Sequence, residues 1–192
     1  MTTTDFIHGY VTKLKNLLDN TDISAITKII DLLEKTQKAK GIVYVLGNGG
    51  SSATASHMAN DLNIGLKRRG IRKFNVISLA DNSPVITAIS NDIGYENIFY
   101  MQLEDVLKPE DLIIAISCSG NSPNITKAVK YAKEIGSQIV GCTGFDGGEL
   151  KQLSDVCFHV DTPKGEYGLV EDMHMILDHI IYSYYISLGS QA

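Results

Sequence analysis

Two glycine- and serine-rich segments have residue types that can bind a phosphate group. The first loop, residues 47–52, reads Gly-Asn-Gly-Gly-Ser-Ser, and the second loop, residues 117–122, reads Ser-Cys-Ser-Gly-Asn-Ser. Glycines let backbone N–H groups approach an anion, and a following helix adds unpaired N–H groups and its positive dipole end. One such loop is common in α/β proteins, but two favour a phosphate site. Neither loop matches GxxxxGK[ST] or GxGxxG, so we expect no nucleotide cofactor.

The order of apolar segments predicts where these loops lie. Short apolar runs typical of buried strands occur at residues 42–46, 74–79, 112–116, 138–142 and 156–160. Helical patterns follow the first four runs, and the closing helix is expected at residues 170–188. Alternating strands and helices predict an α/β fold with a doubly wound, five-stranded parallel sheet. Both loops then follow the carboxyl ends of strands, where open parallel sheets bind ligands.

The first 38 residues have a different character. They carry two helical apolar stripes, which Asn20-Thr21-Asp22 separates as a turn and cap. We expect an N-terminal helical hairpin at residues 1–38 that serves oligomerisation, and an α/β core at residues 39–192. No linker or low-complexity segment interrupts the chain, so residues 1–192 are expected to form a single domain.

Composition limits the partners and the compartment. The net charge is −5, and we interpret the basic cluster at residues 67–73 as a solvated helix end, not a nucleic-acid surface. The three cysteines are widely spaced and form no CxxC motif, which favours a reducing compartment. The N-terminus does not resemble a signal peptide, and no apolar stretch approaches the roughly 20 residues that span a bilayer. We therefore expect a cytoplasmic protein that binds neither nucleic acid nor a membrane.

Four segments together resemble the SIS (sugar isomerase) domain family: residues 47–62, 79–99, 116–128 and 141–150. More narrowly, they are similar to its phosphoheptose isomerase branch, which converts sedoheptulose 7-phosphate to D-glycero-D-manno-heptose 7-phosphate. The resemblance covers nearly the whole chain. It implies a flavodoxin-like three-layer SIS fold, a phosphorylated sugar as substrate, aldose–ketose isomerisation through an enediol(ate), and a homotetramer.

The resemblance also assigns substrate-binding positions, which extend the two loops. With the loop glycines, the expected set is Asn48, Gly49, Gly50, Ser51, Asp92, Ser117, Cys118, Ser119, Ser122 and Glu171. Some positions depart from the family pattern. Cys118 stands where threonine is more usual, and Gly168 stands where the family has a substrate-contacting aspartate.

Four ionisable residues match the family's catalytic positions: His57, Asp61, Glu171 and His179, with Asp61 in place of a glutamate and Glu171 in place of a glutamine. His57 and Asp61 are four apart and share one helix face, while Glu171 and His179 differ by about 80° around the last helix. Two imidazoles and two carboxylates suit either a divalent metal, for which the resemblance implies zinc on all four, or an acid/base pair. We expect Asp61 and His179 to transfer the proton.

Two other functions stay open from the sequence. One is the same chemistry on a related sugar phosphate, because the departures lie at the sugar end of the site. The other is a non-catalytic SIS regulator or scaffold, as in the replication-initiator-binding branch, which should lack the acid/base set. Of the remaining histidines, we interpret His8 and His159 as structural and His174 as a supporting or interface residue.

Overall fold

The computed structural model describes residues 1–189. At its centre is a parallel sheet of the strands β1 (Val43–Gly47), β2 (Val76–Ser78), β3 (Leu112–Ser117), β4 (Gln138–Gly144) and β5 (Val156–Val160). Their spatial order is β2-β1-β3-β4-β5. All residues of β1 and β3 are buried, as expected for strands covered on both faces. The predicted doubly wound α/β architecture is therefore confirmed.

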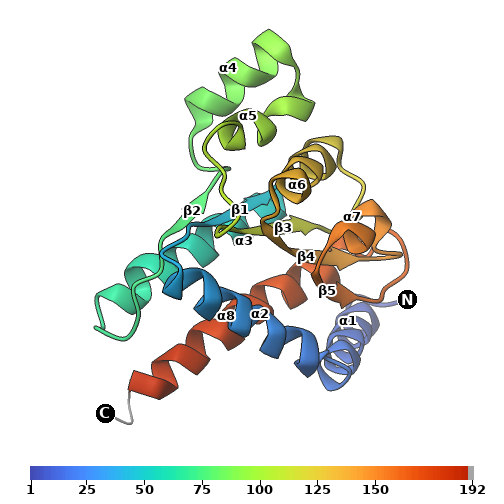
Figure 1. Cartoon of the computed structure of the whole chain (residues 1–192). Helices are drawn as coiled ribbons and strands as arrows, with labels where there is room; N and C mark the ends of the chain where they lie inside the picture. Colours follow the sequence, from blue (N-terminus) through green and yellow to red (C-terminus); the bar gives the residue numbers. More distant parts are fainter. Residues whose placement is uncertain (190–192) are drawn as a thin grey trace.

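Helices cover both faces of the sheet (Figure 1). The α-helices are α1 (Thr3–Asp19), α2 (Ile23–Lys38), α3 (Gly50–Ala59), α4 (Ser83–Ile93), α5 (Tyr100–Leu103), α6 (Pro123–Ile135), α7 (Gly148–Leu153) and α8 (Tyr167–Gly189). One hydrophobic core lies between the sheet and α2, α3 and α8. The other lies between the sheet and α5, α6 and α7. The molecule thus has three layers. Among residues 1–189, no helix is long and apolar enough to cross a membrane.

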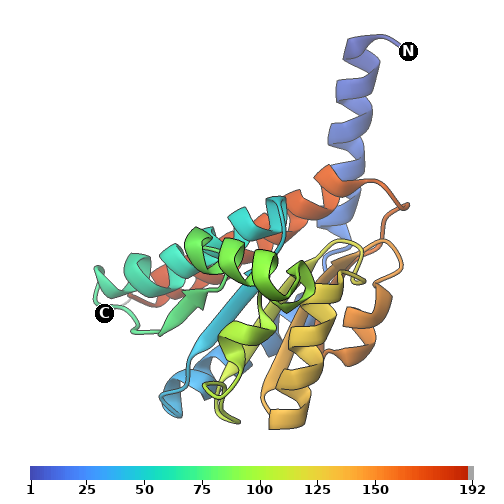
Figure 2. The ribbon, with the colours of Figure 1, turned by 90° about the horizontal axis from the view of Figure 1, so that it is seen from above.

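The two leading helices differ in their packing. In α2, Ala25, Ile26, Ile29 and Leu33 are buried in the first core, so this helix belongs to the α/β domain. In α1 no residue is buried, and Figure 2 shows the helix projecting from the body of the molecule. In the middle of α1 the Tyr10 hydroxyl donates to Asp172 Oδ2 of α8 at 2.6 Å, and beyond it Leu14 and Leu17 pack against the first core. The apolar side chains nearer the start of α1, Phe6, Ile7 and Val11, are exposed.

The helix after β1 changes its winding part-way. It begins as α3 and continues as a π-helix, η1 (Asn60–Gly65), so the helical pattern expected after the first strand forms two segments. A π turn accommodates one extra residue and occurs frequently at functional sites. Here it begins beside Asp61, one of the expected catalytic residues.

Candidate active site

The two loops meet where the chain order of the strands reverses. β1 pairs with β2 on one side and with β3 on the other, and Gly47 lies opposite Ile116 in the register. In open α/β sheets this switch point leaves a crevice beyond the strand ends, which is where ligands bind. A pocket of about 170 Å³ lies there. Its lining consists of Asn48, Ser51, Ile116, Ser117, Cys118, Ser119, Ser122, Tyr167 and Glu171.

In the first loop, side-chain hydrogen bonds fix Asn48. Its amide exchanges two hydrogen bonds with the buried amide of Asn124, at 2.9 and 2.8 Å. The Tyr95 hydroxyl donates to the same Asn48 oxygen at 2.9 Å. Gly49, with φ 53° and ψ −121°, is the N-cap of α3 in a conformation that favours glycine. The loop therefore presents Ser51 and the start of α3 in one defined orientation.

In the second loop, three serine hydroxyls surround the pocket. The Oγ atoms of Ser117 and Ser122 are 3.4 Å apart, and Ser117 Oγ accepts the Gly120 N–H at 3.2 Å. Ser122 is the N-cap of α6, yet its side chain makes no capping hydrogen bond. Its hydroxyl is thus available to a ligand, next to the positive end of a 13-residue helix.

Cys118 lies in the same loop and has the opposite character. It is buried, and burial, followed by the nearby Glu171 carboxylate, raises the pKa of its thiol to about 11. The thiol therefore stays protonated at neutral pH and is not an activated nucleophile. In the pocket, Cys118 is an uncharged lining residue.

Glu171 and Asp92 were both expected to bind the substrate, but they do not line the same pocket. Glu171 lines the pocket and lies against Gly50, where an added Cβ would be 2.5 Å from its carboxylate oxygens. Asp92 is exposed in the last turn of α4, where it accepts a hydrogen bond from Asn91, and it is not part of the pocket lining in this chain.

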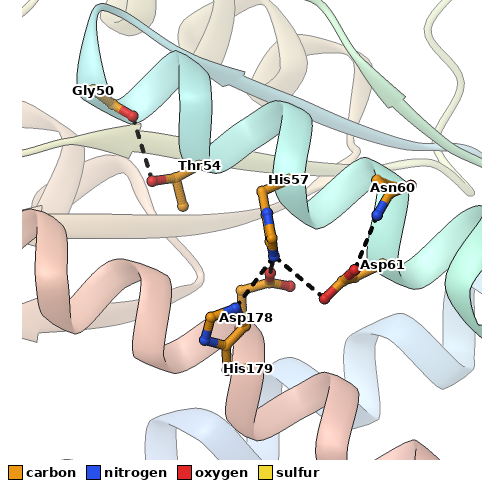
Figure 3. Close-up of polar contacts among 7 residues, drawn as sticks. All are labelled: Gly50, Thr54, His57, Asn60, Asp61, Asp178 and His179. Atoms are coloured by element: carbon orange, nitrogen blue, oxygen red, sulfur yellow. Dashed lines mark hydrogen bonds and ion pairs between the residues drawn. The ribbon is translucent and has the colours of Figure 1, made fainter.

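A second group of functional side chains lies between α3 and α8 (Figure 3). His57 Nε2 is 3.5 Å from Asp61 Oδ2, 3.9 Å from Asp178 Oδ2 and 3.2 Å from His179 Nε2. One nitrogen or oxygen of each residue lies within 4.8 Å of all the others. We call these four residues the His/Asp cluster. The structure thus brings together three of the four predicted ionisable residues, His57, Asp61 and His179.

Asp178 is the member of the His/Asp cluster that was not predicted from the sequence. Its side chain is fully buried, and neither carboxylate oxygen has a hydrogen-bond partner among the described residues. Burial, together with the Asp61 carboxylate, raises the pKa of Asp178 to about 7. A signal was present in the sequence, because Asp178 interrupts the buried stripe that includes Leu177 and Ile181.

The other histidines lie outside the His/Asp cluster. His8 is exposed on α1, and His159 Nδ1 is 2.9 Å from the Thr143 hydroxyl. His174 is buried in α8, with Nε2 3.3 Å from the Thr143 carbonyl oxygen. Burial lowers the pKa of His174 to about 4, so its ring is neutral at physiological pH.

Comparison with known proteins gives the family. A family model for the SIS domain matches residues 6–144. The phosphoheptose isomerase of Helicobacter pylori (strain P12) is 39% identical over 157 residues, which cover 79% of this chain and 78% of that protein. The phosphoheptose isomerase of Clostridium acetobutylicum is 38% identical over 169 residues, covering 88% and 85%. The chain belongs to the phosphoheptose isomerase branch of the SIS domain family.

Solved structures of the same family agree with this assignment. Phosphoheptose isomerase GmhA from Neisseria gonorrhoeae superposes with a TM-score of 0.86 at 25% identity, over 97% of this chain and 100% of that one. The phosphoheptose isomerase from Francisella tularensis gives 0.85 at 25% identity, with the same coverage. The family resemblance and the SIS-type fold expected from the sequence are therefore confirmed.

Proposed function

We propose that this chain is a sugar-phosphate aldose–ketose isomerase that converts sedoheptulose 7-phosphate to D-glycero-D-manno-heptose 7-phosphate. The carrying observation is that two sites lie along α3 and α8. One is the pocket of about 170 Å³ lined by Ser51, Ser117, Ser119 and Ser122, which we call the serine pocket, and the other is the His/Asp cluster. A phosphate site beside paired imidazoles and carboxylates has the parts that such a reaction requires. The phosphoheptose isomerases among its relatives supply the substrate class.

The second loop binds the phosphate in this proposal. Ser117, Ser119 and Ser122 offer hydroxyl donors, and the N-terminus of α6 offers its dipole. The loop is rigid, since Gly120 lies against the Gly147 carbonyl and accepts the Leu150 N–H at 2.9 Å. A rigid phosphate anchor holds the reacting carbons of the sugar in one place, which is a large part of what an isomerase needs.

In this proposal, the groups near the sugar end of the substrate transfer the proton. Isomerisation removes a proton next to a carbonyl and returns it to the neighbouring carbon, while charge develops on oxygen. Asp61 and His179 are the acid/base pair of the proposal, and the two residues reach the same space from α3–η1 and α8. His57, between them, orients both by the contacts at 3.5 and 3.2 Å.

Zinc is the metal that the donor set fits. Imidazole nitrogen and carboxylate oxygen are ordinary zinc ligands, and neither oxygen of buried Asp178 has a hydrogen-bond partner among residues 1–189. When bound, zinc would polarise a substrate oxygen as a Lewis acid. His57, Asp61 and His179 would hold it, as the alternative to a metal-free acid/base pair. The fourth ligand is Glu171, as the family resemblance implies, or Asp178, which lies in the His/Asp cluster.

A homotetramer is also part of the proposal, and α1 supports it. The exposed stripe of this helix includes Phe6, Ile7 and Val11, which are 57%, 54% and 43% exposed. Contiguous exposed apolar side chains mark an association surface. Size-exclusion chromatography with light scattering tests it: the wild type should elute as a tetramer and Phe6→Ser/Val11→Ser as a smaller species. A monomeric wild type would overturn this part.

The isomerase activity is tested by following ketose-to-aldose conversion by NMR. We expect conversion by the wild type, and a loss of roughly a hundredfold or more in kcat for Asp61→Asn and for His179→Ala, which is typical of a lost acid or base. Asp31→Asn, on the exposed face of α2, is the matched control and should keep full activity. Full activity in both site variants would refute the mechanism. Absence of activity in folded wild type would favour the non-catalytic SIS alternative.

A further inference from the structure

Two amides and a phenol form a hydrogen-bonded group next to the first loop. Asn48 follows β1, buried Asn124 lies in the first turn of α6, and Tyr95 begins the 3-10 helix η2 (Tyr95–Asn97). Asn48 lines the serine pocket, but neither Asn124 nor Tyr95 does. Together with Asn48 they line a separate hollow of about 460 Å³. The structure therefore connects Asn124 and Tyr95 to a ligand in the serine pocket through Asn48.

The hydrogen bonds determine which end of each amide is the oxygen. The backbone N–H of Ile125 can only donate, and it contacts Asn124 Oδ1 at 3.0 Å while also bonding to the Ser122 carbonyl. Asn124 Nδ2 then donates to Asn48 Oδ1 at 2.8 Å, and Asn48 Nδ2 donates to Asn124 Oδ1 at 2.9 Å. Turning one amide around would place two donors or two acceptors against each other. The start of α6 therefore determines the orientation of the Asn48 amide.

This orientation leaves Asn48 with one free donor. An amide oxygen has two lone pairs, and Asn48 Oδ1 accepts from Asn124 Nδ2 and from the Tyr95 hydroxyl, the latter at 2.9 Å. The Asn48 nitrogen carries two hydrogens, of which one bonds to Asn124. The other has no partner among residues 1–189. A free amide N–H at a pocket of serine hydroxyls is complementary to an oxygen of a sugar phosphate.

The backbone around Tyr95 is well anchored, although the side chain itself is 51% exposed. η2 packs against α6, and Lys127 Nζ donates to the side-chain oxygen of Asn97. The Asn97 amide also donates to the Ile93 carbonyl at the end of α4. Because these contacts do not involve the Tyr95 hydroxyl, removing that hydroxyl should change its bond to Asn48 without unfolding the segment.

We propose that Tyr95 is a positioning residue of the substrate site, which acts by holding the Asn48 amide so that its free N–H donates to an oxygen of the sugar phosphate. The inference rests on the proposed function for the identity of the ligand. A side chain that is ordered before binding loses less conformational entropy when the ligand arrives. Without the Tyr95 hydroxyl, the Asn48 amide keeps its bonds to Asn124 but is less restrained, so the ligand should bind more weakly.

A double-mutant cycle tests whether Tyr95 acts through Asn48. Isothermal calorimetry measures the binding of sedoheptulose 7-phosphate to the full chain, with Asp61→Asn in every sample to prevent turnover. Tyr95→Phe should weaken binding roughly fivefold and Asn48→Ala roughly tenfold or more, as expected for lost hydrogen bonds. In the Asn48→Ala background, Tyr95→Phe should have no further effect, because the residue through which it acts is gone. Tyr184→Phe is the matched control, since this exposed hydroxyl forms no hydrogen bond within residues 1–189.

Two results of the cycle would overturn the proposal. One is equal affinity in the chains with Tyr95 and with Tyr95→Phe. The other is a Tyr95→Phe effect of the same size with and without Asn48, which would mean that Tyr95 acts by a route that does not involve Asn48.

Steady-state kinetics and thermal unfolding separate positioning from a merely structural role. In chains that retain Asp61, Tyr95→Phe should raise KM by a similar factor and leave kcat within about twofold, because Asn48 lies outside the His/Asp cluster. Its Tm should match that of Tyr184→Phe. A lower Tm with unchanged KM would contradict the inference. A wild type that binds the sugar phosphate without converting it would refute the isomerase and leave this inference standing, whereas a wild type that does not bind it would overturn both.

Discussion

Gly50 of α3 and Glu171 of α8 lie so close that a Cβ on the glycine would be 2.5 Å from both carboxylate oxygens. Seven positions further along each helix, His57 and Asp178 face one another at 3.9 Å. Two turns of each helix therefore join the serine pocket to the His/Asp cluster. The glycine in the first loop thus has a second role besides exposing backbone to a phosphate: it makes room for Glu171.

Replacing Gly50 by alanine tests this close approach. The new methyl group would displace the Glu171 carboxylate, whose flexible side chain can move, so the fold should survive. Because a displacement of about 1 Å at an active site can cost a hundredfold in rate, we expect kcat/KM to fall roughly ten- to a hundredfold. Steady-state kinetics and a Tm measurement check the two parts. Unchanged kinetics would mean that the position of Glu171 does not matter to the reaction.

Much of the fold could be predicted from local sequence signals. A helical pattern was expected after the third apolar run, and the structure has α6 there. Pro123 suits the first turn of a helix, and Gly136 adopts the left-handed conformation that ends it. The two loops were recognisable for the same reason. Their glycines and serines are required by local backbone geometry and by phosphate chemistry, both of which are visible in a short segment.

The composition of the His/Asp cluster could not be derived in this way. The angle of about 80° between Glu171 and His179 places them on one broad helix face, but eight residues also separate them by about 12 Å along the axis. The sequence does not show which part of α8 lies opposite His57. That relationship depends on how α3 and α8 pack, and it brings in Asp178 instead of Glu171.

Ser122 offers a test of phosphate binding with little risk to the fold. Its hydroxyl makes no capping hydrogen bond to α6, so Ser122→Ala should leave the free energy of unfolding nearly unchanged. A hydrogen bond to a charged group contributes about 1.5–3 kcal/mol, so KM for the sugar phosphate should rise roughly ten- to a hundredfold. Inhibition by inorganic phosphate should weaken in parallel. Ser187→Ala, at an exposed serine near the end of α8, is the control, and equal KM values in both variants would argue against a phosphate contact.

His174 makes stability depend on pH. Its pKa is about 4 in the folded protein, against about 6.5 in an unfolded chain, so below pH 6.5 the unfolded state binds more protons. The free energy of unfolding should therefore fall as pH drops from 6.5 toward 4, by about 2 kcal/mol at pH 5 from this group. His174→Gln retains a donor for the Thr143 carbonyl but does not titrate. Urea unfolding at about pH 7.5 and about pH 5 should show a drop that is smaller by about 2 kcal/mol in the variant. Identical drops in both proteins would show that His174 is not the titrating group.

Gly120 and Gly70 separate the cost of a left-handed backbone from the cost of a close contact with the added side chain. Both have left-handed backbone conformations, with φ of 65° and 70°, which cost a residue with a side chain about 1 kcal/mol. A Cβ on Gly120 would lie 2.0 Å from the Gly147 carbonyl oxygen, whereas a Cβ on Gly70 would meet nothing within 4 Å. We therefore expect Gly70→Ala to lower the free energy of unfolding by about 1 kcal/mol and Gly120→Ala by roughly 3 kcal/mol or more, because the backbone must shift. Chemical denaturation of both variants measures the difference. If the two alanine variants are equally stable, the second loop yields to the added methyl group and cannot be the rigid phosphate anchor proposed for it.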